Sequence, residues 1–186
     1  MVNRMSATKP ARMTADEFLA WAMQQPEGKR YELVAGEVVG MAPERAAHAR
    51  WKHRVCAALT EAIPVAGLQC EAFPDGMSVR VGADTVYEPD ALVRCGTPLD
   101  DDAIEIPDPL IIVEVVSPSS GKQDSGSKLE GYFSLPSLRH YLVVTPRSRV
   151  VVVHHQRDAD GNIATRIIRN GPIRLDPPGI ELTGLF

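Results

Sequence analysis

The sequence has little cysteine and no long apolar run. Its three cysteines, Cys56, Cys70 and Cys95, are odd in number and form no CxxC pair, so neither a disulfide framework nor a zinc cluster is predicted. We expect these side chains to be buried in a protein of the reducing cytoplasm. No apolar stretch approaches the ~20 residues that span a membrane as a helix, so no membrane association is predicted.

An excess of basic residues is also lacking. The chain has 20 Lys and Arg against 24 Asp and Glu, which gives a net charge of −4. This balance argues against broad electrostatic binding to nucleic acid, but it agrees with a local basic patch or with carboxylates that bind a cation. The GxSxG, GxxxxGK[ST] and HExxH motifs are absent, so nucleophile-elbow hydrolases, Walker NTPases and HExxH zincins lack their signatures.

The composition is that of a folded domain. The 186 residues are 44% hydrophobic, which is enough for one substantial core. Residues 1–13 are polar and lack the apolar segment of a secretory signal, so a flexible N-terminal arm is predicted there. Residues 14–186 are predicted to form a single domain.

The most apolar stretch runs from Leu110 to Val116 and reads Leu-Ile-Ile-Val-Glu-Val-Val. Such a run is typical of a strand buried on both faces. Its one carboxylate, Glu114, would cost several kcal/mol to bury unless it is paired or binds a cation. Two interpretations therefore remain for Glu114: a buried salt bridge to Arg or Lys, or a metal ligand or catalytic carboxylate.

Periodicity and turn residues predict the other elements. Three helices are expected at Ala15 to Gln24, Ala46 to Ile63 and Asp124 to Leu135. Strands are expected at Tyr31–Val34, Val38–Met41, Gln69–Phe73, Ser78–Val81, Tyr141–Val144 and Val150–His155, with short strands near the C-terminus. Val86 to Arg94 is predicted to be one strand, entered through Pro89. His48 stands near a helix start, where a partly exposed cap residue is expected more than a role in chemistry.

Asp90 and Glu114 each place one acid among the apolar residues of a core strand. Lys128 lies in the first turns of the helix that follows the second strand, and a helix that returns across that strand can bring it to Glu114. Two close carboxylates do not both stay ionised without a cation, and oxygen ligands suit Mg²⁺ or Mn²⁺. The alternative is that Lys128 simply neutralises Glu114.

Five short segments occur in a recognisable order. They are Tyr31-Glu-Leu-Val-Ala-Gly-Glu37, the helix-opening His48, Pro89-Asp90, Val113-Glu-Val-Val-Ser-Pro-Ser119 and Asp124-x-x-x-Lys128-Leu-x-x-Tyr132. Over roughly Thr14 to Val153 the chain resembles the putative restriction endonuclease family of the PD-(D/E)XK nuclease superfamily. The resemblance implies a restriction-endonuclease-like α/β fold, with a mixed β-sheet flanked by helices.

The resemblance also implies roles for particular residues. Asp90 and Glu114 match the superfamily's two acids, and the main-chain carbonyl of Val115 would complete the metal ligands. The superfamily's usual lysine, two residues after the second acid, is replaced here by Val116, and Lys128 resembles a lysine moved into the next helix. Glu32 resembles an additional acid near the start of the fold. The implied activity is Mg²⁺-dependent hydrolysis of phosphodiester bonds in DNA, with Mn²⁺ as a substitute.

Two rival functions follow from the same residues. The acidic balance and Val116 favour a non-catalytic module that binds nucleic acid or protein, and a third hypothesis is an enzyme acting on a small phosphate ester. Basic residues along the cleft would favour the nuclease over both. The candidates are Arg45, Arg50, Lys52, Arg54, Lys122 and Lys128, although a solvated helix face explains the first four equally well. The sequence is compatible with a monomer or a homodimer.

Overall fold

The computed structural model describes residues 12–116, 124–146 and 150–186. Within these ranges it contains three helices and twelve strands. The helices are α1 (Ala15–Ala22), α2 (Ala46–Val65) and α3 (Asp124–Phe133). None of the helices in the described ranges has both the length and the apolar character needed to cross a membrane.

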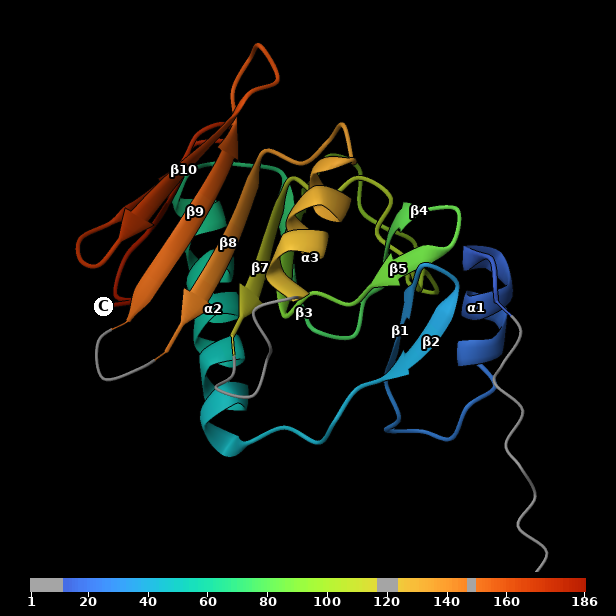
Figure 1. The fold of residues 1–186 in the computed structure, drawn as a ribbon. Helices are drawn as coiled ribbons and strands as arrows, with labels where there is room; N and C mark the ends of the chain where they lie inside the picture. The colour runs from blue at the N-terminus through green and yellow to red at the C-terminus, as the bar shows by residue number, and fades with distance from the viewer. Residues whose placement is uncertain (1–11, 117–123, 147–149) are drawn as a thin grey trace, which may run out of the picture.

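A six-stranded sheet with the order β10-β9-β8-β7-β6-β3 forms the centre of the molecule (Figure 1). Its strands are β3 (Cys70–Pro74), β6 (Ala91–Cys95), β7 (Ile111–Val115), β8 (His140–Thr145), β9 (Val151–Arg157) and β10 (Ile163–Ile168). β7 and β8 are parallel and the other neighbours are antiparallel, so the sheet is mixed. α3 lies in the connection between the two parallel strands, which need a crossover of this kind.

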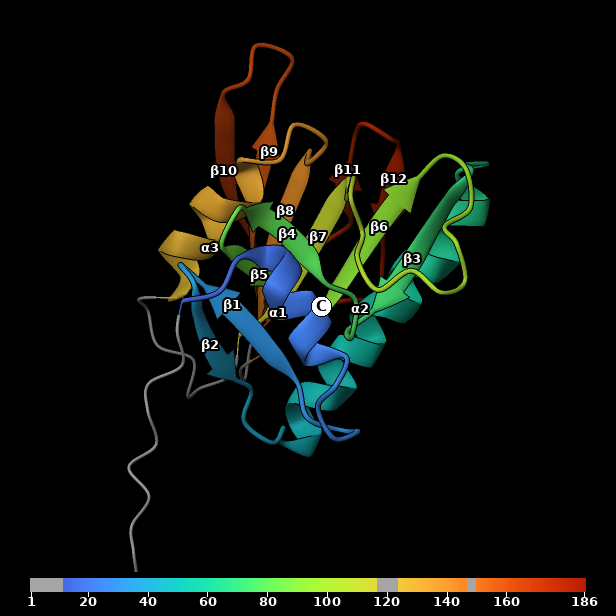
Figure 2. The ribbon, with the colours of Figure 1, turned by 90° about the vertical axis from the view of Figure 1, so that its right-hand side faces the viewer.

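A second, four-stranded sheet has the order β2-β1-β5-β4. Its strands are β1 (Tyr31–Val34), β2 (Glu37–Gly40), β4 (Val79–Gly82) and β5 (Thr85–Tyr87). α1 covers it through Phe18 and Leu19, which pack with Leu33 and Val86 (Figure 2). A two-stranded sheet of β11 (Ile173–Leu175) and β12 (Ile180–Leu182) completes the fold.

The central sheet separates two apolar cores. On one face, the α2 residues Val55 and Leu59 pack in a cluster with Val113 of β7 and with residues of β11 and β12. On the other face, Tyr132 of α3 packs in a cluster with Ile112 of β7 and with residues of β4 and β5. Figure 1 shows α2 behind the sheet and α3 in front of it. The predicted mixed sheet flanked by helices is confirmed.

The prediction of one strand from Val86 to Arg94 is wrong. This stretch forms β5 and β6, which belong to different sheets. Glu88, Pro89 and Asp90 connect them, and Pro89 has no N–H to continue a strand ladder. The break leaves Asp90 at the point where the chain passes from one sheet to the other.

The cysteine prediction also needs correction, because Cys70 and Cys95 form a disulfide bond. The two residues face each other across β3 and β6, with Cα atoms 3.9 Å apart. Cys56 is a free thiol in α2, and burial raises its pKa. The spacing of 25 residues between Cys70 and Cys95 says nothing about strand register, which is what brings them together.

Candidate active site

The residues singled out in the sequence gather around one cavity of about 440 Å³ at the carboxyl end of β7. Glu32, Asp90, Glu114, Val115 and Lys128 all line it. They come from β1, the β5–β6 connection, β7 and α3. The cavity therefore lies where the four-stranded sheet, the six-stranded sheet and α3 meet. The structure thus brings these five residues together, and their roles as metal ligands or catalytic groups stay predictions.

Lys128 links two of the acids. Its Nζ donates to Glu114 Oε1 at 3.0 Å and to Glu32 Oε1 at 2.9 Å, and the lysine side chain is only 8% exposed. Tyr132, one helical turn further along α3, donates its hydroxyl to the same Glu114 oxygen at 2.7 Å. Residues four apart share a helix face, so α3 presents both donors to Glu114 at once.

The protonation of this group follows from burial and from its neighbours. Burial raises the pKa of Glu114 to about 7, although Lys128 and the Tyr132 hydroxyl act in the opposite direction. Burial alone would lower the pKa of Lys128, but the carboxylates of Glu114 and Glu32 outweigh it and raise that pKa above its ordinary value. Lys128 is therefore a fixed cation at neutral pH.

Asp90 reaches the end of β7 from the side of α2. Its Oδ2 accepts a hydrogen bond from the Val115 N–H at 2.7 Å. Lys52 Nζ of α2 lies 3.6 Å from Asp90 Oδ1, and His48 Nε2 lies 3.7 Å from Oδ2. Burial raises the pKa of Asp90, opposed by the Val115 hydrogen bond and by the nearby His48 and Lys52 side chains.

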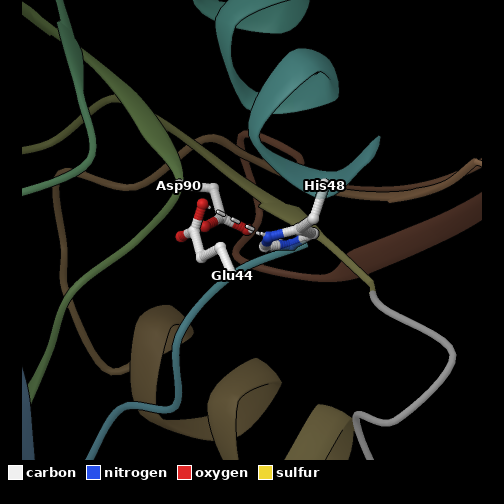
Figure 3. Close-up of side chains that lie close together, drawn as sticks. All are labelled: Glu44, His48 and Asp90. Carbon is white, nitrogen blue, oxygen red and sulfur yellow. Dashed lines mark ion pairs between the residues drawn. The ribbon is translucent and has the colours of Figure 1, made fainter. Parts of the chain in front are cut away.

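His48 and Glu44 stand beside Asp90 (Figure 3). Glu44, His48 and Asp90 each offer a ligand atom, and these three atoms lie within 4.8 Å of one another. His48 Nε2 is also 2.6 Å from the Val115 carbonyl oxygen, and His48 Nδ1 is 3.8 Å from Glu44 Oε2. The carbonyl expected to bind a metal is thus in contact with a histidine.

A network of ion pairs surrounds this centre. Lys52 pairs with Glu44 and Asp75, and Arg30 pairs with Glu44, Asp75 and Glu88. Together with the contacts of Lys128 and Asp90, these pairs join six carboxylates to three fixed cations. The carboxylates are Glu32, Glu44, Asp75, Glu88, Asp90 and Glu114, and the cations are Arg30, Lys52 and Lys128. The described site thus holds three more acids than fixed cations.

The basic residues proposed to line the cleft are distributed unevenly. Arg45 and Lys128 line the main cavity, and Lys52 lines an adjoining one of about 490 Å³. Arg50 and Arg54 are exposed on α2. Lys122 lies outside the described residues.

Two residues of α2 have contacts with the site that the sequence did not predict. His48 was expected to be a cap residue, and Lys52 was a candidate cleft residue that a solvated helix face explained equally well, yet both contact Asp90. A signal was present, because positions 52, 55, 59 and 63 form the buried stripe of α2 and position 48 continues it by one turn. A lysine in a buried stripe indicates an acidic partner, although the sequence does not identify that partner.

Comparison with known proteins agrees with this architecture. Residues 15–183 match the Uma2 family, whose description is putative restriction endonuclease. The chain belongs to this family. The match covers all three sheets and all three helices of the described structure.

Individual proteins also resemble the chain over most of their length. Two uncharacterized proteins of Synechocystis are 28% and 26% identical to it over 153 and 151 residues. The first match covers 81% of this chain and 77% of the relative, and the second covers 80% and 82%. A crystal structure of a putative nuclease from Anabaena variabilis superimposes with a TM-score of 0.70 at 15% identity, covering 89% of this chain and 90% of that one. This likeness shows a shared fold.

The donor set of this family member fits a divalent cation. Carboxylate and main-chain carbonyl oxygens are ligands that Mg²⁺ and Mn²⁺ prefer, and Asp90, Glu114 and Val115 offer them at one cavity. The six carboxylates of the described site also outnumber its three fixed cations, which favours an added positive charge because clustered carboxylates repel one another. The residues therefore suit a metal of this class.

Proposed function

We propose that the protein is a metal-dependent endonuclease that hydrolyses phosphodiester bonds in DNA, with Mg²⁺ or Mn²⁺ as the cofactor. The observation that carries this proposal is the contact of Lys128 with Glu114 in the cavity that Asp90 also lines. Valine occupies position 116, where the superfamily usually has its lysine. Lys128 of α3 instead supplies an ammonium group beside the same acid, Glu114. Family membership supports a nuclease, and DNA as substrate is our inference from it.

Each residue has a distinct task in this proposal. Asp90, Glu114 and the Val115 carbonyl would hold the cation, which when bound supplies a Lewis acid for the phosphate oxygens and for a water. The raised pKa of Lys128 keeps its ammonium group protonated. Lys128 therefore acts as a donor that orients the attacking water and stabilises charge on the phosphate, and it does not remove a proton. Glu32 fixes the position of Lys128 through the hydrogen bond between them.

The test compares plasmid cleavage and metal binding in the same variants. We expect wild type to nick supercoiled plasmid with Mg²⁺ or Mn²⁺ and to unfold at a higher temperature when either ion is present at millimolar concentration, since a ligand of the folded state stabilises it. Asp90→Asn should lose both effects. Lys128→Met should lose nicking and keep the thermal shift, because the lysine is not a ligand.

Asp101→Asn is the matched control, because this acid is exposed in a loop outside the cavity. It should behave as wild type in both assays. Equal nicking by wild type and Lys128→Met would refute the role of Lys128, and an unchanged unfolding midpoint of wild type in either ion would refute the metal site.

A binding module remains a second candidate, and one observation favours it. Lys52 and Lys128 already lie beside Asp90 and Glu114, so ion pairing alone explains why these acids are tolerated in a buried place. This function predicts no nicking by wild type in either ion. It also predicts that affinity for a nucleic acid or protein partner changes little in Asp90→Asn.

A further inference from the structure

One side chain at the cavity has no task in the function proposed above. His48 begins the first turns of α2 and is half-buried, and its two ring nitrogens face different groups. Nε2 is 2.6 Å from the Val115 carbonyl oxygen and 3.7 Å from Asp90 Oδ2. Figure 3 shows the carboxylates of Asp90 and Glu44 next to each other, both on the same side of the His48 ring.

The grouping resembles that of ligands around one ion, because ligand atoms of Glu44, His48 and Asp90 lie within 4.8 Å of one another. Donor atoms bound about 2.1 Å from a common cation lie roughly 3 to 4 Å from each other. The 3.7 Å between His48 Nε2 and Asp90 Oδ2 falls in that range. The 2.6 Å between Nε2 and the Val115 carbonyl oxygen is a hydrogen-bond distance, and because a carbonyl only accepts, the Nε2–H donates to it while no ion is bound. A cation would take the place of that proton, and the ring proton would then sit on Nδ1.

Glu44 is the carboxylate placed to orient the His48 ring. A histidine that binds metal through Nε2 carries its proton on Nδ1, and that N–H is usually directed at a carboxylate or carbonyl. Glu44 Oε2 lies 3.8 Å from His48 Nδ1, which is longer than a hydrogen bond, so a small shift of either side chain would be needed to make one. Lys52 pairs with the other Glu44 oxygen, Oε1, which limits the movement of this carboxylate.

We propose that His48 is a nitrogen ligand of the metal centre, oriented by Glu44, and that it makes the centre select Mn²⁺ over Mg²⁺. The proposal rests on the proposed function only in assuming that a metal binds at Asp90 and Val115. Mg²⁺ prefers oxygen ligands and keeps its water shell, whereas imidazole binds more readily to the transition metals. A centre with one imidazole therefore favours Mn²⁺ beyond what its carboxylates alone would give.

The test measures binding of each ion alone to the full chain, without DNA. Mn²⁺ affinity is obtained from the electron paramagnetic resonance signal of the free ion, and Mg²⁺ affinity from competition with Mn²⁺. We expect His48→Asn to weaken Mn²⁺ binding about 10-fold or more and Mg²⁺ binding much less, because the amide offers an oxygen in place of nitrogen. Glu44→Gln should weaken Mn²⁺ binding by about 10-fold, the usual cost of losing such an orienting carboxylate.

A spectroscopic signature separates a ligand from a structural role. In wild type, bound Mn²⁺ should show electron spin echo modulation from a directly coordinated nitrogen, and His48→Asn should lose it while Asp90 still binds the ion. His53→Asn is the matched control, because His53 is exposed on the same helix and should change neither the modulation nor the affinities. His48→Ala provides a second variant, and thermal unfolding without metal checks that both variants fold.

The outcomes are distinguishable. Mn²⁺ binding without nitrogen modulation, or equal losses of Mn²⁺ and Mg²⁺ affinity in His48→Asn, would overturn the role of His48 and leave the oxygen-ligand site of the proposed function intact. Absence of binding of either ion to wild type would overturn both proposals.

Discussion

At the scale of single residues, one ammonium group balances two buried carboxylates. Lys128 contacts both Glu32 and Glu114, and all three side chains are at most 15% exposed. Removing one partner of a buried ion pair costs more than the pair contributes, because the remaining charge is left without compensation. Here the loss of the lysine would leave two such charges.

We therefore expect Lys128→Met to lower the free energy of unfolding by about 3 kcal/mol in metal-free buffer at pH 8. Adding Glu114→Gln to this variant should restore part of that loss, because it removes one of the two uncompensated carboxylates. Chemical denaturation of the single and double variants measures both effects. Lys29→Met, at an exposed lysine, should change the stability by less than about 0.5 kcal/mol, and an equally small change in Lys128→Met would contradict the prediction.

The candidate site was predictable where a charged residue interrupts an apolar pattern. Asp90 and Glu114 stand out in this way, and Lys128 was indicated by its place in the helix that follows the second strand. The structure places all three at one cavity. Glu44 was not identified, and Lys52 was named only as a candidate cleft residue that a solvated helix face explained equally well, because a lysine or glutamate near a helix start is ordinary until its partner is known. Those partners come from distant segments, and no local pattern encodes them.

At the scale of elements, the position of α3 depends on a close contact with the four-stranded sheet. A Cβ atom at Gly131 would lie 2.8 Å from Tyr87 Cε2 and 3.3 Å from Val81 Cγ2, so the helix approaches β4 and β5 as only a glycine allows. Lys128 lies on the same helix, less than one turn away. A helix pushed outward at Gly131 would carry the ammonium group away from Glu114.

Gly131→Ala and Gly126→Ala form a matched pair on this helix. Gly131→Ala should destabilise the protein by about 1 to 3 kcal/mol, because the clash outweighs the better helix propensity of alanine. Gly126→Ala meets nothing within 4 Å and should stabilise it by up to about 1 kcal/mol. Thermal denaturation gives the sign of each change, and a stabilised Gly131→Ala would show that the sheet accommodates the extra methyl group.

The elements themselves followed well from periodicity. The buried strand around Glu114, the stripe of α2 and the hairpin of β8 and β9 all formed close to the predicted bounds. The β5–β6 break and the Cys70–Cys95 bond were missed for a common physical reason. Both depend on which strands become neighbours in a sheet, and that choice is made by packing across the whole molecule.

At the scale of the whole molecule, a buried histidine pair connects the C-terminal hairpin to the central sheet. His140 of β8 and His154 of β9 are both at most 1% exposed, with His140 Nδ1 2.9 Å from His154 Nε2. His140 Nε2 is 2.6 Å from the Pro177 carbonyl oxygen, between β11 and β12. The carbonyl can only accept, so His140 donates from Nε2 and accepts from His154.

This chain of hydrogen bonds requires a neutral His140, because a proton on its Nδ1 would remove the acceptor for the His154 N–H, and a proton on either ring would bury a charge without a partner. Burial and the neighbouring His140 lower the pKa of His154 to about 4, and burial also lowers the pKa of His140. In the unfolded chain both rings titrate near their ordinary pKa of about 6.5, so the unfolded state takes up protons first as pH falls. Their contribution to stability is thus complete above about pH 6.5 and is lost as pH falls toward 4.

We expect His154 alone to account for a loss of about 2 to 3 kcal/mol across this range. The measurement is the free energy of unfolding as a function of pH for wild type and His154→Gln, because their difference isolates this group from the carboxylates. The variant should show a flatter curve between pH 6.5 and 4. His53→Gln, at an exposed position, should retain the wild-type slope, and parallel curves for wild type and His154→Gln would rule the explanation out.

The Lys128–Glu32 hydrogen bond joins residues 96 positions apart in the chain, and the Val115–Asp90 bond joins residues 25 apart. Contacts of such long range close large loops and tend to form late in folding, after local hairpins such as β1–β2 and β8–β9. Until they form, the acids of the site are ordinary solvated charges with no common ligand position. Under the proposed function, a newly made chain therefore acquires its affinity for a cation only with its last native contacts, so that a nuclease of this design would be inert throughout its own synthesis.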